Sequence, residues 1–190
     1  MTQNKKGLAI ILSSPSGGGK SSIAKALLAE DSRLVLSISA TTRKPRPGDE
    51  EGIHYFFKTR DCFLAMINNE ELLEYSEIYG NLYGIPRDFV EEQLNQGRDV
   101  LFDIDYQGAY KLKTILKDLV LSIFILPPSI ETLRSRLEAR GQDSQEEIDF
   151  RITLAEEEMA QAKNYDYTVV NEDFAATLKA IKVLIEKERK

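Results

Sequence analysis

Short, continuous hydrophobic runs alternate along this chain with segments whose apolar residues recur every three or four positions. The continuous runs, at residues 8–12, 34–38, 100–104, 121–126 and 167–170, predict strands that are buried on both faces. The periodic segments predict helices at residues 20–29, 108–116, 130–139, 145–163 and 174–188. Strands that alternate with helices in this way are typical of an α/β fold around a central parallel sheet.

Residues 41–98 interrupt this alternation. A polar loop rich in proline and glycine, at 41–52, is followed by two predicted strands, at 54–57 and 72–79, with a helix at 61–68 between them. A further helix at 87–96 returns the chain to the sheet. We interpret this region as a mixed α+β subdomain that is inserted into the α/β core.

Helix ends in the second half of the chain carry clear signals. Ser129 follows two prolines, and Ser144 stands three residues before Glu147, which predicts a capping box. Gly141 is expected to end the helix before it.

Length and composition are those of one globular domain: 190 residues, 42% of them hydrophobic and 29% charged. The formal net charge of −6 argues against a diffuse attraction to nucleic acid or to an anionic membrane. A single cysteine, Cys62, excludes an internal disulfide and suits a reducing compartment; its helical context favours packing over reactivity. No run approaches the roughly 20 apolar residues of a membrane span. We therefore expect a cytoplasmic protein.

A glycine-rich loop lies between the first predicted strand and the first predicted helix. Glycines let the backbone wrap closely around an anion, and the N–H groups and a lysine then converge on phosphate oxygens. Ser14 stands where the strict phosphate-loop pattern has glycine, and a glycine-rich turn with an incidental lysine is the alternative. The candidate ATP-binding residues are Ser14, Pro15, Ser16, Gly17, Gly18, Gly19, Lys20, Ser21 and Ser22.

Two acids end a buried strand at alternate positions, Asp103 and Asp105, and are expected on one face of it. The carboxyl end of a parallel strand is where such folds bind ligands. Asp103, directly or through water, and the Ser21 hydroxyl are candidate ligands of Mg²⁺, while Asp105 is expected to reach toward the acceptor. Solvent-facing acids at a strand end are the alternative.

Several segments together resemble the guanylate kinase family of P-loop proteins, in order and spacing, from about residue 7 to 188. They are residues 13–22, 39–46, 52–55, 69–75, 80–84, 103–108 and 136–141, followed by Arg151. The resemblance implies a single domain with a three-layer P-loop core at about 1–37, 97–135 and 153–190. It also implies a GMP-binding subdomain at about 38–96 and a helical lid at about 136–152.

The implied activity is reversible transfer of the γ-phosphoryl group of ATP to GMP, and also to dGMP, with Mg²⁺ as cofactor. ATP and GMP are then the partners, without nucleic acid or membrane, and the protein is a monomer or a homodimer. The acceptor phosphate is already an anionic nucleophile, so the reaction requires no general base. This agrees with the single histidine, His54, which is expected to make a structural contact or to be exposed.

Residues of the GMP site come from the inserted region. Guanidinium groups bind phosphate bidentately, and the resemblance implies that Arg43, Arg46, Tyr55 and Tyr83 hold the GMP phosphate. Loop charge at the surface is the alternative for the two arginines.

Recognition of guanine requires an acceptor pair for N1–H and the exocyclic amine, and a donor for O6. The resemblance implies Glu74 for the first, helped by Asp105, and Ser39 for the second; a plain surface acid is the alternative for Glu74. One position departs from the family: many relatives carry Ser or Thr where this chain has Ile85. Ile85 cannot donate a hydrogen bond from its side chain, so Ser39 or a backbone N–H would have to serve O6 alone, which bears on the degree of guanine selectivity.

Arg136 and Arg140 share one face of a predicted helix, and Arg151 lies on the next helix. The resemblance implies that these lid cations, with Lys20 and Arg43, form the catalytic set. A solvated basic helix end, favoured by the helix dipole, is the alternative.

Two rival functions remain open at this stage. Guanylate kinase-like domains also occur in scaffolding proteins that bind peptides, although those tend to lose the cations that this chain keeps. A kinase for another acceptor, such as AMP or a pyrimidine nucleotide, or a P-loop NTPase with a different task, is the second rival.

Overall fold

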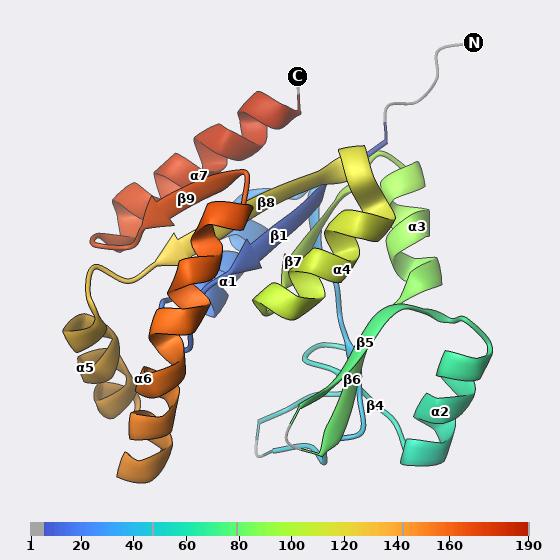
Figure 1. Cartoon of the computed structure of the whole chain (residues 1–190). Coiled ribbons are helices and arrows are strands. Elements are labelled where there is room, and N and C mark those ends of the chain that lie inside the picture. The colour runs from blue at the N-terminus through green and yellow to red at the C-terminus, as the bar shows by residue number, and fades with distance from the viewer. Residues whose placement is uncertain (1–5, 47, 79, 142, 190) are drawn as a thin grey trace.

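The computed structural model describes residues 6–46, 48–78, 80–141 and 143–189. Five parallel strands form the central sheet, in the order β2-β7-β1-β8-β9 (Figure 1). Their bounds are β1 (Ala9–Ser13), β2 (Leu34–Leu36), β7 (Asp99–Asp103), β8 (Val120–Leu126) and β9 (Tyr167–Val170). The predicted α/β fold with a parallel sheet is confirmed.

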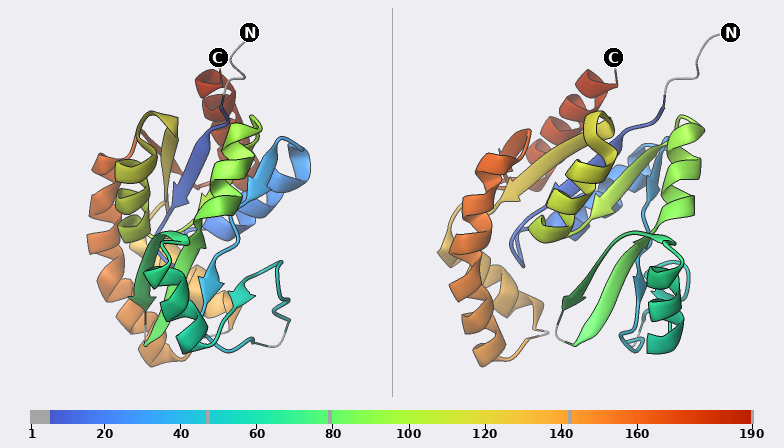
Figure 2. Two further views of the ribbon diagram at one scale, coloured as in Figure 1. Left: turned by 90° about the vertical axis from the view of Figure 1, so that its right-hand side faces the viewer. Right: turned by 45° about the vertical axis from the view of Figure 1, so that its right-hand side comes forward.

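Helices cover both faces of this sheet, which gives three layers (Figure 2). Ile10 and Leu12 of β1 pack toward α1 (Lys20–Glu30) and α7 (Phe174–Glu188). Ala9 and Ile11 pack toward α3 (Arg87–Asn95) and α4 (Tyr106–Leu116). Because successive side chains of a strand point to opposite faces, a strand buried on both sides must be hydrophobic throughout. None of the helices in the described part of the chain combines the length and apolarity needed to span a membrane.

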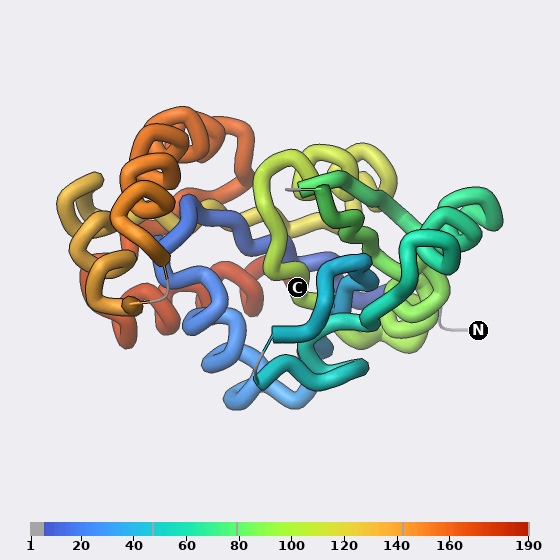
Figure 3. Tube along the Cα trace, turned by 90° about the horizontal axis from the view of Figure 1, so that it is seen from below, coloured from blue at the N-terminus to red at the C-terminus, as the bar shows by residue number. Residues whose placement is uncertain are grey.

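A second sheet stands below the first, in the order β4-β3-β6-β5 (Figure 2). Its strands are β3 (Ala40–Thr41), β4 (Phe56–Phe57), β5 (Leu72–Ile78) and β6 (Asn81–Pro86), and α2 (Arg60–Asn68) packs against it. Phe63 of α2 is fully buried in the small apolar cluster between them. Seen from below, this sheet and the pair formed by α5 (Ile130–Arg140) and α6 (Gln145–Ala160) occupy opposite sides of the molecule (Figure 3).

The predicted helix ends are confirmed. The Ser129 hydroxyl accepts from the N–H of Thr132, and Ser144 and Glu147 form both bonds of the capping box. Gly141 ends α5 in the left-handed conformation, with φ 64°.

Other predictions are corrected by the structure. Asp105 does not lie on the strand: β7 ends at Asp103, and the Asp105 carboxylate caps α4 by accepting from the N–H of Gly108, at 2.8 Å. Cys62 is exposed rather than packed, because its neighbour Phe63 takes the buried position. The expectation for His54, a structural contact or exposure, is confirmed: the residue is exposed, and its Nδ1 accepts from the backbone N–H of Glu50.

Some elements differ from the predicted ones in extent. Strand β3 and strand β6 were not predicted, and the predicted strand at 54–57 is reduced to Phe56–Phe57. Helix α6 ends at Ala160 and continues as a 3₁₀ turn, Gln161–Asn164; a second such turn, Lys117–Leu119, precedes β8. Residue 79, at the end of the predicted strand 72–79, lies outside the described residues.

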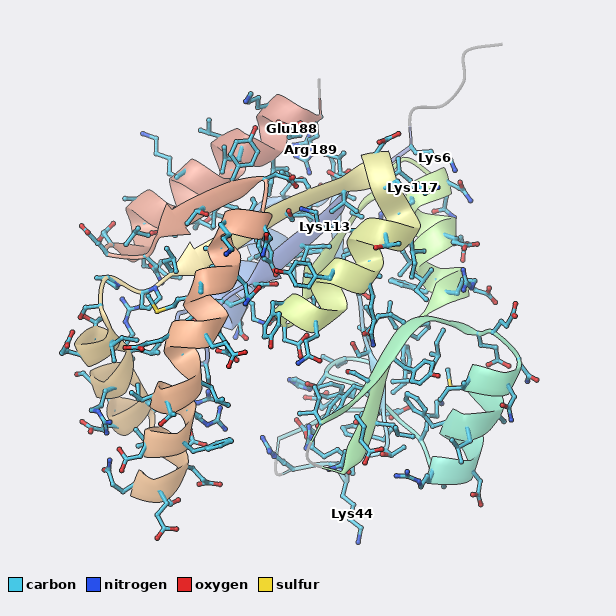
Figure 4. The ribbon with its side chains drawn as sticks, in the orientation of Figure 1. Lys6, Lys44, Lys113, Lys117, Glu188 and Arg189 are labelled. Carbon is cyan, nitrogen blue, oxygen red and sulfur yellow. The ribbon has the colours of Figure 1, made fainter. Side chains whose placement is uncertain are left out.

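A buried carboxylate at the amino ends of the central strands bonds to a residue just before β1 and to a residue just after α7. Asp99 is 5% exposed; its Oδ1 accepts from the N–H of Leu8 at 2.7 Å, and its Oδ2 from Nε of Arg189 at 2.6 Å. Arg189, near the end of α7 (Figure 4), also donates to Asp31 at the end of α1. One carboxylate therefore ties β7, the start of β1 and α7 together.

Replacing Asp99 by alanine is expected to reduce the free energy of unfolding by about 2–4 kcal/mol, because a partly buried N–H and a partly buried guanidinium lose a carboxylate acceptor. Urea unfolding followed by circular dichroism measures this change. Asp118→Ala, at an exposed position, is the matched control and should change the free energy by less than about 0.5 kcal/mol. Equal stability of the two variants would contradict the prediction.

Candidate active site

The glycine-rich loop folds as an open turn whose glycines are needed for different reasons. Gly17 and Gly19 have positive φ, 88° and 98°, and Gly19 begins α1 without a side-chain cap. A Cβ on Gly19 would overlap the Asn171 side-chain amide, which donates to the carbonyl of Gly18 at 3.0 Å. The loop therefore leaves the first N–H groups of α1 open to an anion, as the sequence predicts.

This loop forms one wall of a cavity of about 860 Å³. All nine predicted loop residues line the cavity, together with three further predicted site residues, Asp105, Arg136 and Arg140. Four lining residues were not predicted: Glu158, Asn171, Glu172 and Phe174.

Lys20 lies where β1 and β7 end side by side. Its ammonium group is 2.7 Å from Oδ1 of Asp103 and donates to the carbonyl of Ile104 at 2.9 Å. The parallel register, which pairs Leu12 with Asp103, brings the two groups together. The Lys20 side chain is about one-fifth exposed, and its ammonium group is held at the foot of the loop.

Two of the predicted lid cations reach the loop or its immediate support. Arg136 donates through Nη2 to the carbonyl of Asn171 at 2.9 Å, and its Nη1 is buried without a hydrogen-bond partner among the described residues. Arg151 donates to the Ser16 hydroxyl at 2.5 Å and to Asp143 at 3.1 Å. Arg140, although exposed, also lines the cavity. The Nη1 group of Arg136 is therefore a hydrogen-bond donor that an anion in this cavity could engage.

An acid that was not predicted also faces the loop. Glu158, in the same cavity, accepts from the backbone N–H of Ser16. Burial raises the pKa of the Glu158 carboxyl, and this hydrogen bond lowers it in part. Glu158 follows Arg151 by seven residues on α6, a spacing that places both on one helical face and could have identified it.

A second group of side chains gathers on the second sheet. The Arg43 guanidinium lies 5.1 Å from the centre of the Tyr55 ring, and the rings of Tyr55 and Tyr83 are 6.0 Å apart. Pairing of β3 with β6, which sets Thr41 opposite Tyr83, positions this group. Burial raises the pKa of the Tyr55 hydroxyl, which therefore stays a neutral hydrogen-bond donor.

The Asp49 carboxylate joins the Arg43 guanidinium to the backbone of the polar loop. It accepts from Nη2 of Arg43 at 2.9 Å and from the backbone N–H of Arg46 at 2.8 Å. The Arg46 residue itself is exposed. Asp49 lies in the polar loop, where the sequence pattern did not distinguish it from other acids.

Glu74 lies between the two sheets. A bulge in β5 breaks the alternation of the strand, so that Leu72, Leu73 and Glu74 are all buried in succession. Glu74 is 8% exposed, and its Oε2 is 3.3 Å from the ammonium of Lys111, a residue of α4 that the sequence did not indicate. A Cβ at Gly108 would lie 3.5 Å from Oε1 of Glu74 and 3.5 Å from Oδ1 of Asp105, so the two carboxylates lie on either side of the start of α4.

The remaining two predicted positions differ in their surroundings. Ser39 is half-buried, and its carbonyl accepts from the N–H of Phe56, the first residue of β4. Ile85 is 1% exposed and packs with Leu73 and Val90 in the apolar core. An apolar side chain at Ile85 thus suits its surroundings.

The family model described as guanylate kinase matches residues 6–188. The chain belongs to the guanylate kinase family. ATP:GMP phosphotransfer, an ATP-dependent nucleoside monophosphate kinase activity, follows from this membership. The resemblance inferred from the sequence is confirmed.

Individual relatives agree with this assignment. Guanylate kinase of Rickettsia felis is 56% identical over all of this chain and 98% of its own length. The crystal structure of guanylate kinase from Anaplasma phagocytophilum is 36% identical, with a TM-score of 0.81 over all of this chain and 89% of that one. The SH3-kinase fragment of tight junction protein 3 is 13% identical, with a TM-score of 0.51 over 97% of this chain and 58% of that one, and shares only the fold.

The geometry of the loop in this guanylate kinase leads to a prediction. Replacing Gly19 by alanine should weaken ATP binding by about 10- to 100-fold, because Ala at φ 98° is strained and its Cβ displaces Asn171 from Gly18. Titration calorimetry with ATP, in the absence of GMP, measures the affinity.

Gly80→Ala is the matched control. Gly80 also has positive φ, 75°, but a Cβ there meets nothing within 4 Å. This variant should lose stability, by about 1 kcal/mol, and keep its affinity for ATP. Unchanged ATP affinity of the Gly19 variant would show that the loop does not bind the nucleotide.

Proposed function

We propose that this guanylate kinase aligns the γ-phosphoryl group of ATP with the phosphate of GMP between the two clusters of cations. The observation that carries the proposal is the convergence of Lys20, Arg136 and Arg151 on one glycine-rich loop and its support. A separate group, Arg43 with Tyr55, supplies the second anion site. Two phosphate-binding groups on different elements suit a reaction between two phosphates.

The ATP side consists of the nine loop residues, 14–22. Their backbone N–H groups and the ammonium of Lys20 hold the phosphate oxygens, while Arg136, Arg140 and Arg151 neutralise the charge of the transferring group. The buried Nη1 of Arg136, which lacks a partner among the described residues, supports this role.

Magnesium is proposed to arrive with ATP. Ser21 and Asp103 offer oxygen ligands, which Mg²⁺ prefers, and the described residues hold no group of three or more His, Cys, Asp or Glu that could bind a metal by itself. This fits an ion that is held by one carboxylate, one hydroxyl, water and the nucleotide's own phosphates. When bound, it neutralises charge that develops on the phosphate oxygens.

The GMP phosphate is proposed to bind Arg43, Arg46, Tyr55 and Tyr83. Arg43 donates to Asp49, and the phosphate of GMP would compete with Asp49 for the Arg43 guanidinium. The base would then donate N1–H and its amine to Glu74, with Asp105 beside the amine and the Ser39 hydroxyl at O6. The buried position of Glu74 supports this role, since a mispaired group there is costly.

The chemical step requires no proton acceptor on the protein. An oxygen of the GMP phosphate attacks the γ-phosphorus of ATP, the bond to the β–γ bridging oxygen breaks, and its electron pair leaves with ADP. Water must be excluded, which supports the division into a core, a GMP-binding subdomain at about 38–96 and a lid at about 136–152 that close together. By packing, α3 belongs to the core, because Val90 and Leu94 contact it.

We also propose dGMP as an acceptor, a cytoplasmic location, and a monomer or homodimer without nucleic acid or membrane. The single cysteine supports the location, and the net charge of −6 supports the absence of nucleic acid and of an anionic membrane as partners.

Lys20→Met is expected to lower kcat by about 100- to 1,000-fold, because the cation that stabilises the transferring phosphoryl group is removed. A coupled assay of ADP formation with ATP, Mg²⁺ and GMP measures the rate. Lys25→Met, at an exposed position on the same helix, is the control and should retain wild-type turnover. Near-normal activity of the Lys20 variant would refute the assignment of the loop.

The same assay with GMP, dGMP, AMP, UMP and CMP tests the base site. Turnover is expected with the two guanine nucleotides alone, because Glu74 offers two acceptors where adenine presents an acceptor and a donor. Comparable turnover with AMP would overturn the assignment of Glu74 while leaving the phosphate sites intact.

A further inference from the structure

Lys111 joins the core to the proposed guanine site. It projects from α4, which packs on β5, and its ammonium is 3.3 Å from Oε2 of Glu74 and also donates to the carbonyl of Tyr75. The Lys111 side chain is 46% exposed, whereas that of Glu74 is 7% exposed. A buried carboxylate is thus paired with a cation that solvent can reach.

The charged groups that act on Glu74 are few among the described residues. Both come from α4 and its cap: Lys111 attracts the carboxylate, and Asp105 repels it. On the other side, the paired stretch of β6, residues 84–86, carries no titratable side chain. Burial raises the pKa of the Glu74 carboxyl, the Lys111 ammonium lowers it in part, and Asp105 adds to the rise.

The protonation state of Glu74 decides which base it can accept. An ionised carboxylate offers two acceptors, which match the N1–H and amine of guanine. A protonated carboxyl offers one donor and one acceptor, which match N1 and the amine of adenine and leave guanine with a mispaired donor.

We propose that Lys111 is a positioning residue which keeps Glu74 in its ionised, two-acceptor form and so determines the preference for guanine over adenine. This inference rests on the proposed role of Glu74. Ile85 gives it more weight, because that buried apolar side chain cannot add a hydrogen-bond donor for O6. The acceptor pair at Glu74 must then carry more of the selectivity.

Lys111→Met is expected to raise KM for GMP by about 10-fold near pH 7 and to leave kcat within about twofold, because Lys111 touches no reacting atom. The ratio of kcat/KM for GMP to that for AMP should fall. Removing the cation raises the pKa of Glu74 further, so more of it is protonated at a given pH. The ratio of the variant's KM to the wild-type KM should therefore grow as the pH is lowered from about 8 to about 6. Taking this ratio cancels the titration of the GMP phosphate itself.

Three variants separate this role from a structural one. Lys111→Arg keeps the charge and should restore KM to within about threefold of the wild type. Glu74→Gln cannot ionise, so adding Lys111→Met to it should change KM by less than about twofold. Lys6→Met is the control, because it also removes one exposed positive charge. Figure 4 shows Lys6 at the opposite end of the molecule from Lys44, which follows β3 of the second sheet, so this variant should leave KM unchanged.

The outcomes distinguish the role of Lys111 from the role of Glu74 in the guanine site. A Lys111→Met enzyme with wild-type KM across the pH range overturns the inference, and if Glu74→Gln still loses GMP the base site stands. A loss that persists in the Glu74→Gln background would also overturn it, because Lys111 would then act by tying α4 to the Tyr75 carbonyl. Wild-type KM for Glu74→Gln would overturn the guanine site itself. Circular dichroism of each variant confirms that it is folded.

Discussion

Parallel pairing of β1 with β7 is the constraint on which the rest of the site depends. It brings two strand ends together, so that Lys20 from the loop after β1 meets Asp103 at the end of β7, at 2.7 Å. Two residues beyond the end of β7, the Asp105 carboxylate caps α4. That helix then carries Lys111 to Glu74 in the second sheet. One register thus fixes the foot of the phosphate loop and also the link between the two sheets.

Three cations of the site each have an acid of the protein beside them: Lys20 has Asp103, Arg43 has Asp49, and Arg151 has Asp143. These pairs hold long side chains near their working positions without a nucleotide. Two anionic substrates can then be bound by exchange of partners within a protein whose net charge is −6. The cost of ordering each cation has been met during folding, which leaves more of the binding energy for alignment.

The sequence was informative where one local rule determined the outcome. Continuous apolar runs predicted all five strands of the central sheet, and the spacing of Ser144 and Glu147 predicted a capping box. Strand β6 was missed because Gly84 and Pro86 disfavour strands. The strand is stabilised by pairing with β5, which precedes it directly, and with β3, which lies about 40 residues earlier in the sequence. Asp105 was placed on β7 because periodicity does not show where a strand ends. Lys111 left no signal, since only the packing of α4 on β5 gives it a partner.

Ile85 shows how a departure from the family pattern can be absorbed. Sequence alone treats it as a missing hydroxyl at the base, whereas the structure shows a side chain 1% exposed in the apolar core. At this position a hydroxyl would have to find a partner among apolar neighbours, which is costly, while isoleucine gains from burial. In the proposed base site, selection then rests mainly on Glu74, with Ser39 and Asp105 beside it. A carboxylate so deeply buried serves as a double acceptor only if something keeps it charged. The one cation paired with Glu74 among the described residues is Lys111 on α4, so the proposed selectivity in the second sheet would depend on a helix of the core.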